Sequence, residues 1–592
     1  MIVGNNSFLC KIGDHGEIEY AFYPHVGYEL HFFDSSLAIY DKEIMWIWDK
    51  EWSVYQKYIE DTNIFKTTLE NENIIFVIKD LVPISHNVLI RRVFIKNKLP
   101  YNYNFKLFFY ENLRIGEHPS ENTVKFLDDC IVKFNGKYTF CISSDKKINS
   151  YQCGNRYSEK SAYKDIENGL LSENPESVGV LTDSAIEWDI DLKPHGKVAF
   201  NIYIFPHIGS NIEIIKNQLN IIKNLSSEIK NISLNYWKSS FDIKGYLFNE
   251  KYLKLAKRAL MILTMLSDKN GGIIASPSIH PDYRYVWGRD GSYMAVALSI
   301  YGIKNIPWRF FHFMSKVQNL DGSWLQNYYT DGKPRLTALQ IDQIGSVLWA
   351  MEVYYRTTGD REFVKKFWET IEKAGNFLYN ASLSLMPCFD LWEEKYGVFS
   401  YTLGAMYGGL RAGCSLAKAI EEKKEDWKKA LDKLKKDVDL LYLSDEERFV
   451  KSINPLNKEI DTSILGLSYP FGLVKVNDER MIKTAEAIEK AFKYKVGGIG
   501  RYPSDVYFGG NPWIITTLWL ALYYRRLFIT TNDRKYLEKS KKLFNWVINH
   551  IYLFPEQIHK ELAIPVSAMP LGWSCAMLLF YLYKNDDIIV IK

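Results

Sequence analysis

The sequence lacks most of the short motifs that mark metal, nucleotide and nucleophile chemistry. Its seven cysteines are scattered over 592 residues without a C-x-x-C pair, so neither a zinc site nor a disulfide framework is predicted. There is no G-x-x-x-x-G-K-[ST] phosphate loop, no H-E-x-x-H pair and no G-x-S-x-G elbow. The G-G-I-G of residues 497–500 lacks the full dinucleotide spacing. We therefore expect no metal and no cofactor, and hydrolysis by carboxylates is the leading chemistry left.

Long apolar runs and an excess of one charge are also missing. The longest apolar stretch, near residues 513–524, is followed by Arg525 and Arg526 and is too short to span a bilayer. The 74 basic and 70 acidic residues are well mixed and give a net charge of +4, which does not indicate nucleic-acid binding. The first residues, M-I-V-G-N-N-S-F-L-C-K, lack the charged and apolar regions of a secretory signal. We expect neither a nucleic-acid nor a membrane partner, and a cytoplasmic location where thiols stay reduced.

The chain is long and rich in aromatic side chains. A length of 592 residues exceeds what one core usually supports, about 250 to 300 residues, so two or more domains are predicted. The 40 Tyr, 33 Phe and 16 Trp could hold the C–H faces of sugars, since binding sites combine rings with a few placed polar groups. Packing in a core would explain most of these rings equally well.

The first 208 residues read as β structure. Residues 88–96, 106–110 and 198–205 are rich in branched and aromatic side chains and are bounded by turn formers. Asn135 and Gly136 separate C-I-V-K-F from K-Y-T-F-C, which is a strong hairpin signal. Many short strands without helical periodicity predict an antiparallel β-sandwich over residues 1–208, with a structural or accessory role.

Helical patterns dominate the rest of the chain. Residues 212–232 predict a linking helix within a connecting region, 209–245, and a helical domain is expected over 246–592. Asp360 is a candidate N-cap for a helix that presents apolar residues from Phe363 to Leu378 on one face. Long loops rich in Gly, Pro, Trp and Tyr separate these helices, and such loops usually carry function. Further amphipathic segments are predicted at 426–442, 480–492, 514–528 and 533–551.

One acidic stretch stands out as a candidate catalytic loop. Residues 388–405 read C-F-D-L-W-E-E-K-Y-G-V-F-S-Y-T-L-G-A, and their glycines and aromatics predict a loop. Asp390, Glu393 and Glu394 crowd around a tryptophan, and both burial and like charge disfavour the anion of a carboxyl group. That environment produces a general acid. A solvated acidic turn is the alternative reading of the same cluster.

Four loops together resemble one enzyme family. They are Y-V-W-G-R-D-G-S-Y-M at 285–294, the acidic stretch at 388–394, G-R-Y-P-S-D-V-Y-F-G-G-N-P-W at 500–513, and F-P-E-Q at 554–557 with P-L-G-W-S from 570. In this order they resemble the glucoamylase family of inverting glycoside hydrolases, from about residue 250 to the end. The N-terminal G-N-N-S-F and Y-P-H-V-G are similar to the β-sandwich of prokaryotic members. The resemblance implies a multidomain β plus α fold, with an N-terminal antiparallel β-sandwich and a C-terminal (α/α)6 barrel.

The resemblance also implies two catalytic glutamates. Inversion needs a proton donor for the leaving oxygen and a carboxylate that activates water, about 6.5 to 9.5 Å apart. By its position in D-L-W-E-E, Glu393 would be the general acid. Asp390 and Glu394 beside it would bind substrate and help to raise its pKa. Glu556 in P-E-Q would be the general base, unless it is simply an exposed loop residue.

Substrate-binding residues follow from the same motifs. Arg289 and Asp290 match the family pair that holds hydroxyls of the terminal glucose, and Arg501 and Asp505 match a second pair. Directed Arg donors beside Asp acceptors suit neutral hydroxyls better than a phosphate, although structural salt bridges would look the same. Three tryptophans are expected as walls of the pocket or as core residues: Trp287, Trp392 and Trp513.

Some sequence features leave the site less defined. Gly288 stands where prokaryotic relatives often have proline, which bears on the stiffness of that loop. Residues 321–343 look like a wall of the pocket leading into a helix, with Trp324 and Asp342 as suspects.

The expected activity is release of β-glucose from non-reducing ends of maltooligosaccharides, dextrin or glycogen. Trehalase is a close alternative on the same scaffold. A non-catalytic glucan-binding or regulatory protein is another. The sequence leaves the oligomeric state open.

Overall fold

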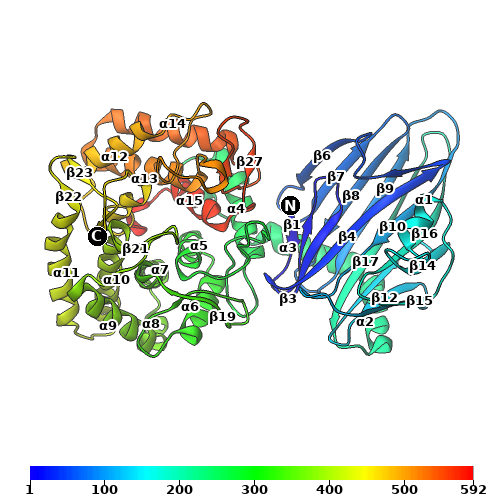
Figure 1. The fold of residues 1–592 in the computed structure, drawn as a ribbon, viewed down its shortest axis with the longest axis horizontal. Coiled ribbons are helices and arrows are strands. Elements are labelled where there is room, and N and C mark those ends of the chain that lie inside the picture. Colours follow the sequence, from blue (N-terminus) through cyan, green and yellow to red (C-terminus); the bar gives the residue numbers. More distant parts are fainter. Residues whose placement is uncertain (591–592) are drawn as a thin grey trace. The chain divides into compact units, whose positions relative to one another are not determined.

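The computed structural model describes residues 1–590, and the chain divides into two compact units, residues 1–242 and 243–592. Figure 1 shows the first unit as mainly strands, coloured blue to cyan, and the second as mainly helices, coloured green to red. The helices that follow the last strand of the first unit, α2 and α3, belong to that unit.

The first unit is built from two antiparallel sheets. The larger sheet has nine strands and the other has eight. One continuous core cluster contains apolar side chains from both, such as Val3 and Phe33 from one sheet and Phe76 and Val93 from the other. The sheets therefore pack as a sandwich.

The eight-stranded sheet runs β1 (Ile2–Gly4), β2 (Leu9–Ile12), β3 (Ile18–His25), β4 (Tyr28–Asp41), β10 (Tyr103–Glu111), β16 (Thr182–Leu192) and β14 (Ser150–Asn155), with β5 (Glu43–Trp46) on β4. The nine-stranded sheet runs β15 (Glu176–Gly179), β11 (Asn122–Phe126), β12 (Cys130–Phe134), β13 (Tyr138–Ser144), β17 (Lys197–Ile208), β9 (Leu89–Asn97), β8 (Ile74–Leu81), β7 (Phe65–Glu70) and β6 (Ser53–Tyr58).

Strand alternation explains why the nine-stranded sheet is buried on both faces. In β17, Ile202 and Ile204 point into the core between the sheets, whereas Tyr203 and Phe205 point to the opposite face. That outer face is covered by the apolar side of α2 (Ile212–Asn224) and by α3 (Ser226–Ser239). The single linking helix predicted over 212–232 is thus two helices that meet at Leu225. On the eight-stranded sheet, the short helix α1 (Ala162–Glu167) covers the outer face.

The second unit is a closed ring of inner helices surrounded by outer ones. Each inner element contacts the next in the order α5, α7, α10, η4, α13, α15, and α15 returns to α5. Five are α-helices, and the fourth position is held by a short 3₁₀ segment. The inner elements are α5 (Gly288–Ile300), α7 (Ile341–Thr358), α10 (Ser400–Ala419), η4 (Thr462–Leu467), α13 (Ile514–Thr531) and α15 (Gly572–Leu582).

The outer helices each pack on one or two inner elements. Their exposed faces are polar: in α11, only Trp427, Ala430 and Leu434 are buried among thirteen residues. The outer helices are α4 (Leu253–Met265), α6 (Asn305–Val317), α8 (Arg361–Lys366), α9 (Trp368–Ser384), α11 (Glu425–Asp437), α12 (Glu479–Ala491) and α14 (Arg534–His550). Short hairpins join the layers: β18 (Leu325–Tyr328) with β19 (Pro334–Leu339), β22 (Tyr442–Leu443) with β23 (Arg448–Phe449), and β26 (Gln557–Ile558) with β27 (Pro565–Val566). A four-stranded sheet consists of β20 (Cys388–Phe389), β21 (Tyr396–Phe399), β24 (Ser452–Asn454) and β25 (Leu456–Asn457).

Two local predictions were wrong. Asp360 does cap a helix, accepting a hydrogen bond from the backbone N–H of Phe363 at 3.0 Å, but that helix is α8 and ends at Lys366. A break at Phe367 separates it from α9, so one predicted helix is two. The stretch 388–405 is a loop only over residues 390–395, because these residues connect β20 to β21 and α10 begins at Ser400.

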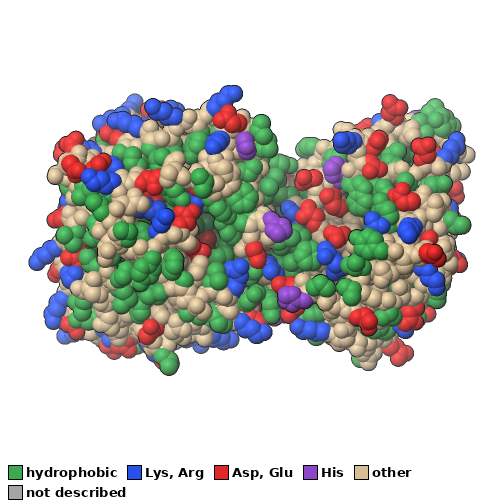
Figure 2. Space-filling model, viewed as in Figure 1, with side chains coloured by type: hydrophobic (Ala, Val, Ile, Leu, Met, Phe, Trp, Pro, Cys, Tyr) green, Lys and Arg blue, Asp and Glu red, His purple; other side chains and the backbone are tan. Residues whose placement is uncertain are grey.

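The surface carries both signs of charge. On the face drawn in Figure 2, Lys and Arg side chains are interspersed with Asp and Glu on both units. Within residues 1–590, none of the helices combines the length and apolar character needed to cross a membrane.

Candidate active site

The pocket is formed where several inner helices begin. Trp287 and Trp513 directly precede α5 and α13, and Leu571 precedes α15. The acidic stretch lies in the turn between β20 and β21, just before α10. The pocket is lined by Ala275, Tyr283, Trp287, Arg289, Asp290, Leu391, Trp392, Glu393, Arg501, Trp513, Ile515, Glu556, Leu571 and Trp573.

Glu393 lies in this pocket together with Glu556. The Glu393 carboxylate accepts a hydrogen bond from the indole N–H of Trp287 at 2.7 Å and another from the Gln326 amide at 2.6 Å. The guanidinium of Arg289 lies 3.5 Å from the same oxygen that Trp287 contacts. These contacts fix the orientation of a carboxyl group whose side chain is 26% exposed and therefore accessible from the pocket.

Glu556 is almost fully buried, with 2% exposure. Its backbone is fixed on both sides, because its N–H donates to Ala568 and its carbonyl accepts from the N–H of Ile514. The Ser567 hydroxyl and the Gln557 amide donate to its carboxylate. Burial raises the pKa of Glu556 to about 7, and these two hydrogen bonds oppose the rise. Glu556 therefore changes its charge near neutral pH.

Arg289 and Asp290 lie in the first turn of α5. Arg289 is held by Asp342, which is fully buried, at 3.2 Å between Nη1 and Oδ2. Its Nε lies 3.4 Å from Asp290 Oδ2, and neither of these two atoms forms a hydrogen bond. Burial raises the pKa of Asp290 to about 6. The predicted pair is thus adjacent in the pocket, with a charged donor and a charged acceptor side by side.

Arg501 and Asp505 form a bidentate ion pair. Arg501 Nε and Nη2 donate to the two Asp505 oxygens at 2.8 and 2.6 Å. Glu394 accepts from Arg501 Nη2 at 2.8 Å and from the Tyr502 hydroxyl. Only Arg501 of this group lines the pocket. Asp505 and Glu394 therefore orient the Arg501 guanidinium and do not themselves line the pocket.

Asp390 does not line the pocket but holds its loop in place. Its Oδ1 accepts from the backbone N–H of Glu394 at 2.8 Å, which closes the turn. Its Oδ2 lies 3.4 Å from the buried ammonium of Lys451. The same ammonium is 2.9 Å from Asp461, and Asp461 also accepts from the indole N–H of Trp392. Lys451 therefore links the acidic turn to one wall of the pocket.

Four tryptophans wall the pocket: Trp287, Trp392, Trp513 and Trp573. The first three were predicted, and the rings of Trp392 and Trp513 lie 5.7 Å apart at 60°. The buried indole N–H groups of Trp513 and Trp573 have no hydrogen-bond partner. Buried polar groups without partners are uncommon, so such groups in a pocket indicate a polar ligand.

Several residues of the site were not predicted from the sequence. Gln326 lies in the 321–343 segment, where Trp324 and Asp342 were suspected instead. Trp324 is buried and donates to the Met314 carbonyl, so it packs behind the wall. Asp342 does contact the site, through Arg289.

Other unpredicted residues surround Glu556. Ser567 contacts the carboxylate, and Tyr283 lines the pocket with its hydroxyl 2.7 Å from that of Tyr507. A lone Ser or Tyr in a loop carries no sequence signal of its own, so spatial proximity was needed to find them.

Comparisons with known proteins agree with this architecture. The sequence profile described as "Glycosyl hydrolases family 15" matches residues 250–583. The chain is 65% identical over its whole length to "Uncharacterized glycosyl hydrolase MJ1610" of Methanocaldococcus jannaschii, covering 99% of that protein. "Trehalase 1" of Sulfolobus acidocaldarius is 24% identical, with 87% of this chain and 85% of the relative covered.

A solved structure shares the fold of the whole chain. It is a bacterial glucoamylase complexed with acarbose, with a TM-score of 0.83 at 18% identity, covering 100% of this chain and 94% of the other. This similarity confirms the predicted fold class of an N-terminal β-sandwich followed by an (α/α)6 barrel. From the profile match and the 65% identical relative, the chain belongs to glycosyl hydrolases family 15, the glucoamylase family of glycoside hydrolases.

Proposed function

We propose that this protein is an exo-acting, inverting α-glucosidase of the glucoamylase type. It would hydrolyse α-1,4 bonds at the non-reducing ends of maltooligosaccharides, dextrin or glycogen and release β-glucose. The observation that carries the proposal is that Glu393 and Glu556, from loops far apart in the chain, line one pocket with Arg289 and Arg501. The cytoplasmic location expected from the sequence stays a prediction.

The chemistry follows from these groups. Glu393 gives its proton to the glycosidic oxygen as the bond to the anomeric carbon breaks. The Glu556 carboxylate takes a proton from a water that attacks the same carbon from the opposite face. The hydroxyl of that water becomes the new anomeric hydroxyl, with inverted configuration. Because the base must be ionised, turnover requires Glu556 to lose its proton, and its pKa is about 7.

The pocket walls suit the end of a neutral glucan. The tryptophan rings offer apolar faces to sugar C–H groups, and Arg289 and Asp290 bring a donor group and an acceptor group for hydroxyls to the same pocket. Arg501 presents further N–H groups while its charge is offset by Asp505 and Glu394. This balance favours hydroxyls over a phosphate.

Replacement of each glutamate by glutamine tests the proposal. We expect Glu393→Gln and Glu556→Gln each to lower kcat on maltotriose by about 10²- to 10⁴-fold, the usual contribution of general acid–base catalysis. Glu561→Gln is the matched control, because Glu561 is exposed in the turn between β26 and β27 and does not line the pocket. ¹H NMR during hydrolysis should show β-glucose first. Unchanged turnover in either glutamine variant, or α-glucose as the first product, would refute the assignment.

Trehalase is the second candidate. Two relatives that match over 85% and 80% of their own length are trehalases, from Sulfolobus acidocaldarius and Thermoplasma volcanium, at 24% and 22% identity. Comparing kcat/KM on trehalose with that on maltotetraose separates the two activities. A protein that binds maltotetraose but turns over neither sugar would instead be the non-catalytic glucan-binding form.

A further inference from the structure

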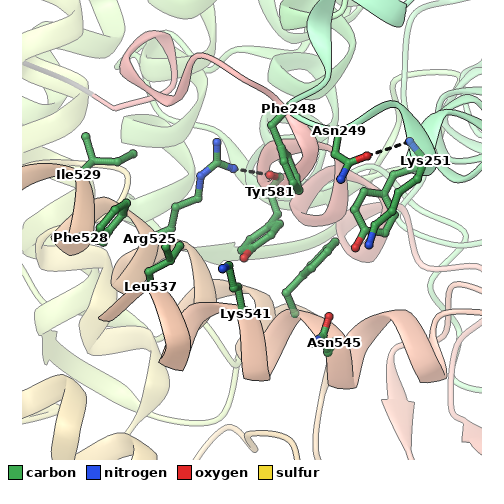
Figure 3. Close-up of a pocket in the computed structure, with 12 residues that line it drawn as sticks. Phe248, Asn249, Lys251, Arg525, Phe528, Ile529, Leu537, Lys541, Asn545 and Tyr581 are labelled. Atoms are coloured by element: carbon green, nitrogen blue, oxygen red, sulfur yellow. Dashed lines mark hydrogen bonds between the residues drawn. The ribbon is translucent and has the colours of Figure 1, made fainter. Parts of the chain in front are cut away.

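A second cavity in the helical unit has a chemistry that glucan hydrolysis does not use. Its volume is about 530 Å³, within the range of small-molecule sites, compared with about 80 Å³ for the candidate active-site pocket. It is formed by the segment before α4, including η2 (Glu250–Tyr252), and by α13, α14 and α15 (Figure 3). Its lining residues are Phe248, Asn249, Lys251, Tyr252, Arg525, Phe528, Ile529, Leu537, Lys541, Phe544, Asn545 and Tyr581.

The cavity is separate from the active site. Helix α13 begins next to Trp513 in the active-site pocket and reaches the cavity at Arg525. Twelve residues of α-helix span about 18 Å at 1.5 Å per residue. Helix α15 makes the same connection, with Trp573 in the pocket and Tyr581 in the cavity. A ligand of the cavity would therefore not occupy the site of hydrolysis.

Aromatic rings form one side of the cavity. Phe544 and Tyr581 are buried and stack at 4.0 Å between ring centroids, with 13° between their planes. Phe248 stands edge-on to Tyr581 at 6.1 Å, and Tyr252 stands edge-on to Phe544 at 5.2 Å. Phe248 remains 45% exposed, so part of this aromatic surface is open to a ligand.

The charged groups of the cavity are all positive. Among the described lining residues there are Lys251, Arg525 and Lys541, and no Asp or Glu. Arg525 is fixed by the backbone carbonyls of Tyr581 and Tyr583, as Figure 3 shows for Tyr581. The positive charge of Arg525 also stabilises the ionised form of the buried Asp586 and so opposes the rise that burial causes in the pKa of that carboxyl.

The positive charges of Lys251 and Lys541 are less compensated by nearby groups than the charge of Arg525. Lys541 has a distant ion pair with Glu538, at 3.7 Å, and both side chains are more than half exposed, so this pair contributes little. Lys251 lies over the ring of Tyr252, at 4.8 Å from the centroid. The cavity therefore presents positive charge beside aromatic rings.

This composition does not suit a neutral sugar. Sugar hydroxyls need acceptors as well as donors, and the candidate active site supplies Asp290 beside Arg289. In the cavity, Asn249 Oδ1 already accepts from the backbone N–H of Lys251. The amide of Asn545 and the Asn249 NH₂ group are left to hydrogen-bond the edge of a ligand.

We propose that this cavity binds a nucleotide, with its flat base against the exposed ring of Phe248 and its phosphates at Lys251 and Lys541. Rings provide apolar area and stacking for a base, and ammonium groups bind phosphate oxygens through charge-assisted hydrogen bonds. A sugar phosphate would satisfy the lysines but leave the rings uncovered.

Calorimetric titration of the full-length protein with ADP tests the proposal. Adenosine, which lacks the phosphates, and glucose 1-phosphate, which lacks the base, are the comparison ligands. We expect ADP to bind at least about tenfold more tightly than either, since a hydrogen bond to a charged group contributes enough for about 10- to 100-fold in affinity. Lys541→Glu should weaken ADP binding by at least about tenfold for the same reason. Lys542→Glu, on the exposed side of the same helix and outside the cavity, should not change it. Phe248→Ala should weaken ADP and adenosine but not glucose 1-phosphate.

Three results would overturn the proposal. They are no binding of ADP at millimolar concentration, equal losses in Lys541→Glu and Lys542→Glu, and glucose 1-phosphate binding as tightly as ADP. Equal losses would indicate general attraction of an anion to a basic helix instead of a site. Because Lys541 and Lys542 are exposed, unchanged thermal unfolding midpoints are expected for their two variants. Phe248→Ala removes a ring that packs on Tyr581, so its midpoint should be measured and its titration carried out well below that temperature.

Discussion

The hydrogen bond from Ser567 to Glu556 sets where activity is lost in acid. The carboxylate must be ionised to activate water, so the proposed turnover falls as pH decreases through the pKa of Glu556, about 7. The Ser567 hydroxyl stabilises the ionised form, and its removal should raise this pKa further. A hydrogen bond to a charged group contributes about 1.5 to 3 kcal/mol, and 1.36 kcal/mol corresponds to one pKa unit. Ser567→Ala should therefore move the acidic limb of the pH profile upward by at least about one unit.

The consequence is a loss of activity that depends on pH. With a shift of one unit, the ionised fraction of Glu556 at pH 6 falls about tenfold, and at pH 9 it hardly changes. The assay is kcat/KM on maltotriose between pH 5 and pH 10, because this ratio reports ionisations of the free enzyme. A variant that lost activity equally at all pH values would show damage to the pocket instead of a pKa change.

A second substitution separates the hydroxyl from the backbone. Ser567 has a φ of 66°, a left-handed conformation that glycine adopts without strain and alanine does not. Ser567→Gly removes the same hydroxyl with less strain. If the hydroxyl is the cause, both variants shift the acidic limb by the same amount. An acidic limb that stays at the wild-type pH in both variants would refute the reasoning.

Two further predictions concern groups that hold the pocket in shape. Gln326→Leu removes one of the hydrogen bonds that orient Glu393, and we expect kcat on maltotriose to fall about tenfold or more with little change in KM. Activity on α-glucosyl fluoride, whose leaving group needs no proton, should be retained, and an equal loss on both substrates would contradict a positioning role. Lys451→Met leaves Asp390 and Asp461 buried without their cation and should lower the free energy of unfolding by about 3 to 5 kcal/mol, measured by urea titration. A change below 1 kcal/mol would show that the buried pair is dispensable.

The sequence predicted strands and outer helices better than inner helices. Outer helices such as α11 and α14 have one apolar face, and their periodicity marked them at 426–442 and 533–551. Helices α5 and α15 are buried on every side, so their composition has no polar face from which to read a period. Their existence followed only from the family resemblance.

Glycine misled the prediction at the start of α10. Gly404 was taken as a sign of a loop, but it lies inside a helix that packs closely on η4. A Cβ at this position would lie 2.6 Å from the carbonyl oxygen of Gly466. The glycine is required by the approach of two backbones, which is a property of the tertiary structure.

The site residues also divide into those that sequence motifs predicted and those that only the structure revealed. Glu393, Glu556, Arg289 and Arg501 stood in recognisable motifs, and all four line one pocket. The partners that orient Glu393 come from segments remote in sequence: Gln326 contacts Glu393 across 67 positions. Such contacts depend on loop placement in the closed ring, which local patterns do not encode.

Which of the two glutamates acts as the general acid and which as the general base can be tested directly. The sequence predicted that Asp390 and Glu394 would act on Glu393, but Asp390 is engaged with the backbone turn and Lys451, and Glu394 with Arg501. It is Glu556 whose pKa burial raises to about 7, a property expected of a general acid, whereas motif position assigns it as the base.

α-Glucosyl fluoride distinguishes the two assignments, because fluoride leaves without a proton while the attacking water still needs a base. If Glu393 is the acid, Glu393→Gln keeps its turnover of the fluoride and Glu556→Gln does not. Restored turnover in Glu556→Gln alone would reverse the roles while leaving the inverting reaction itself in place.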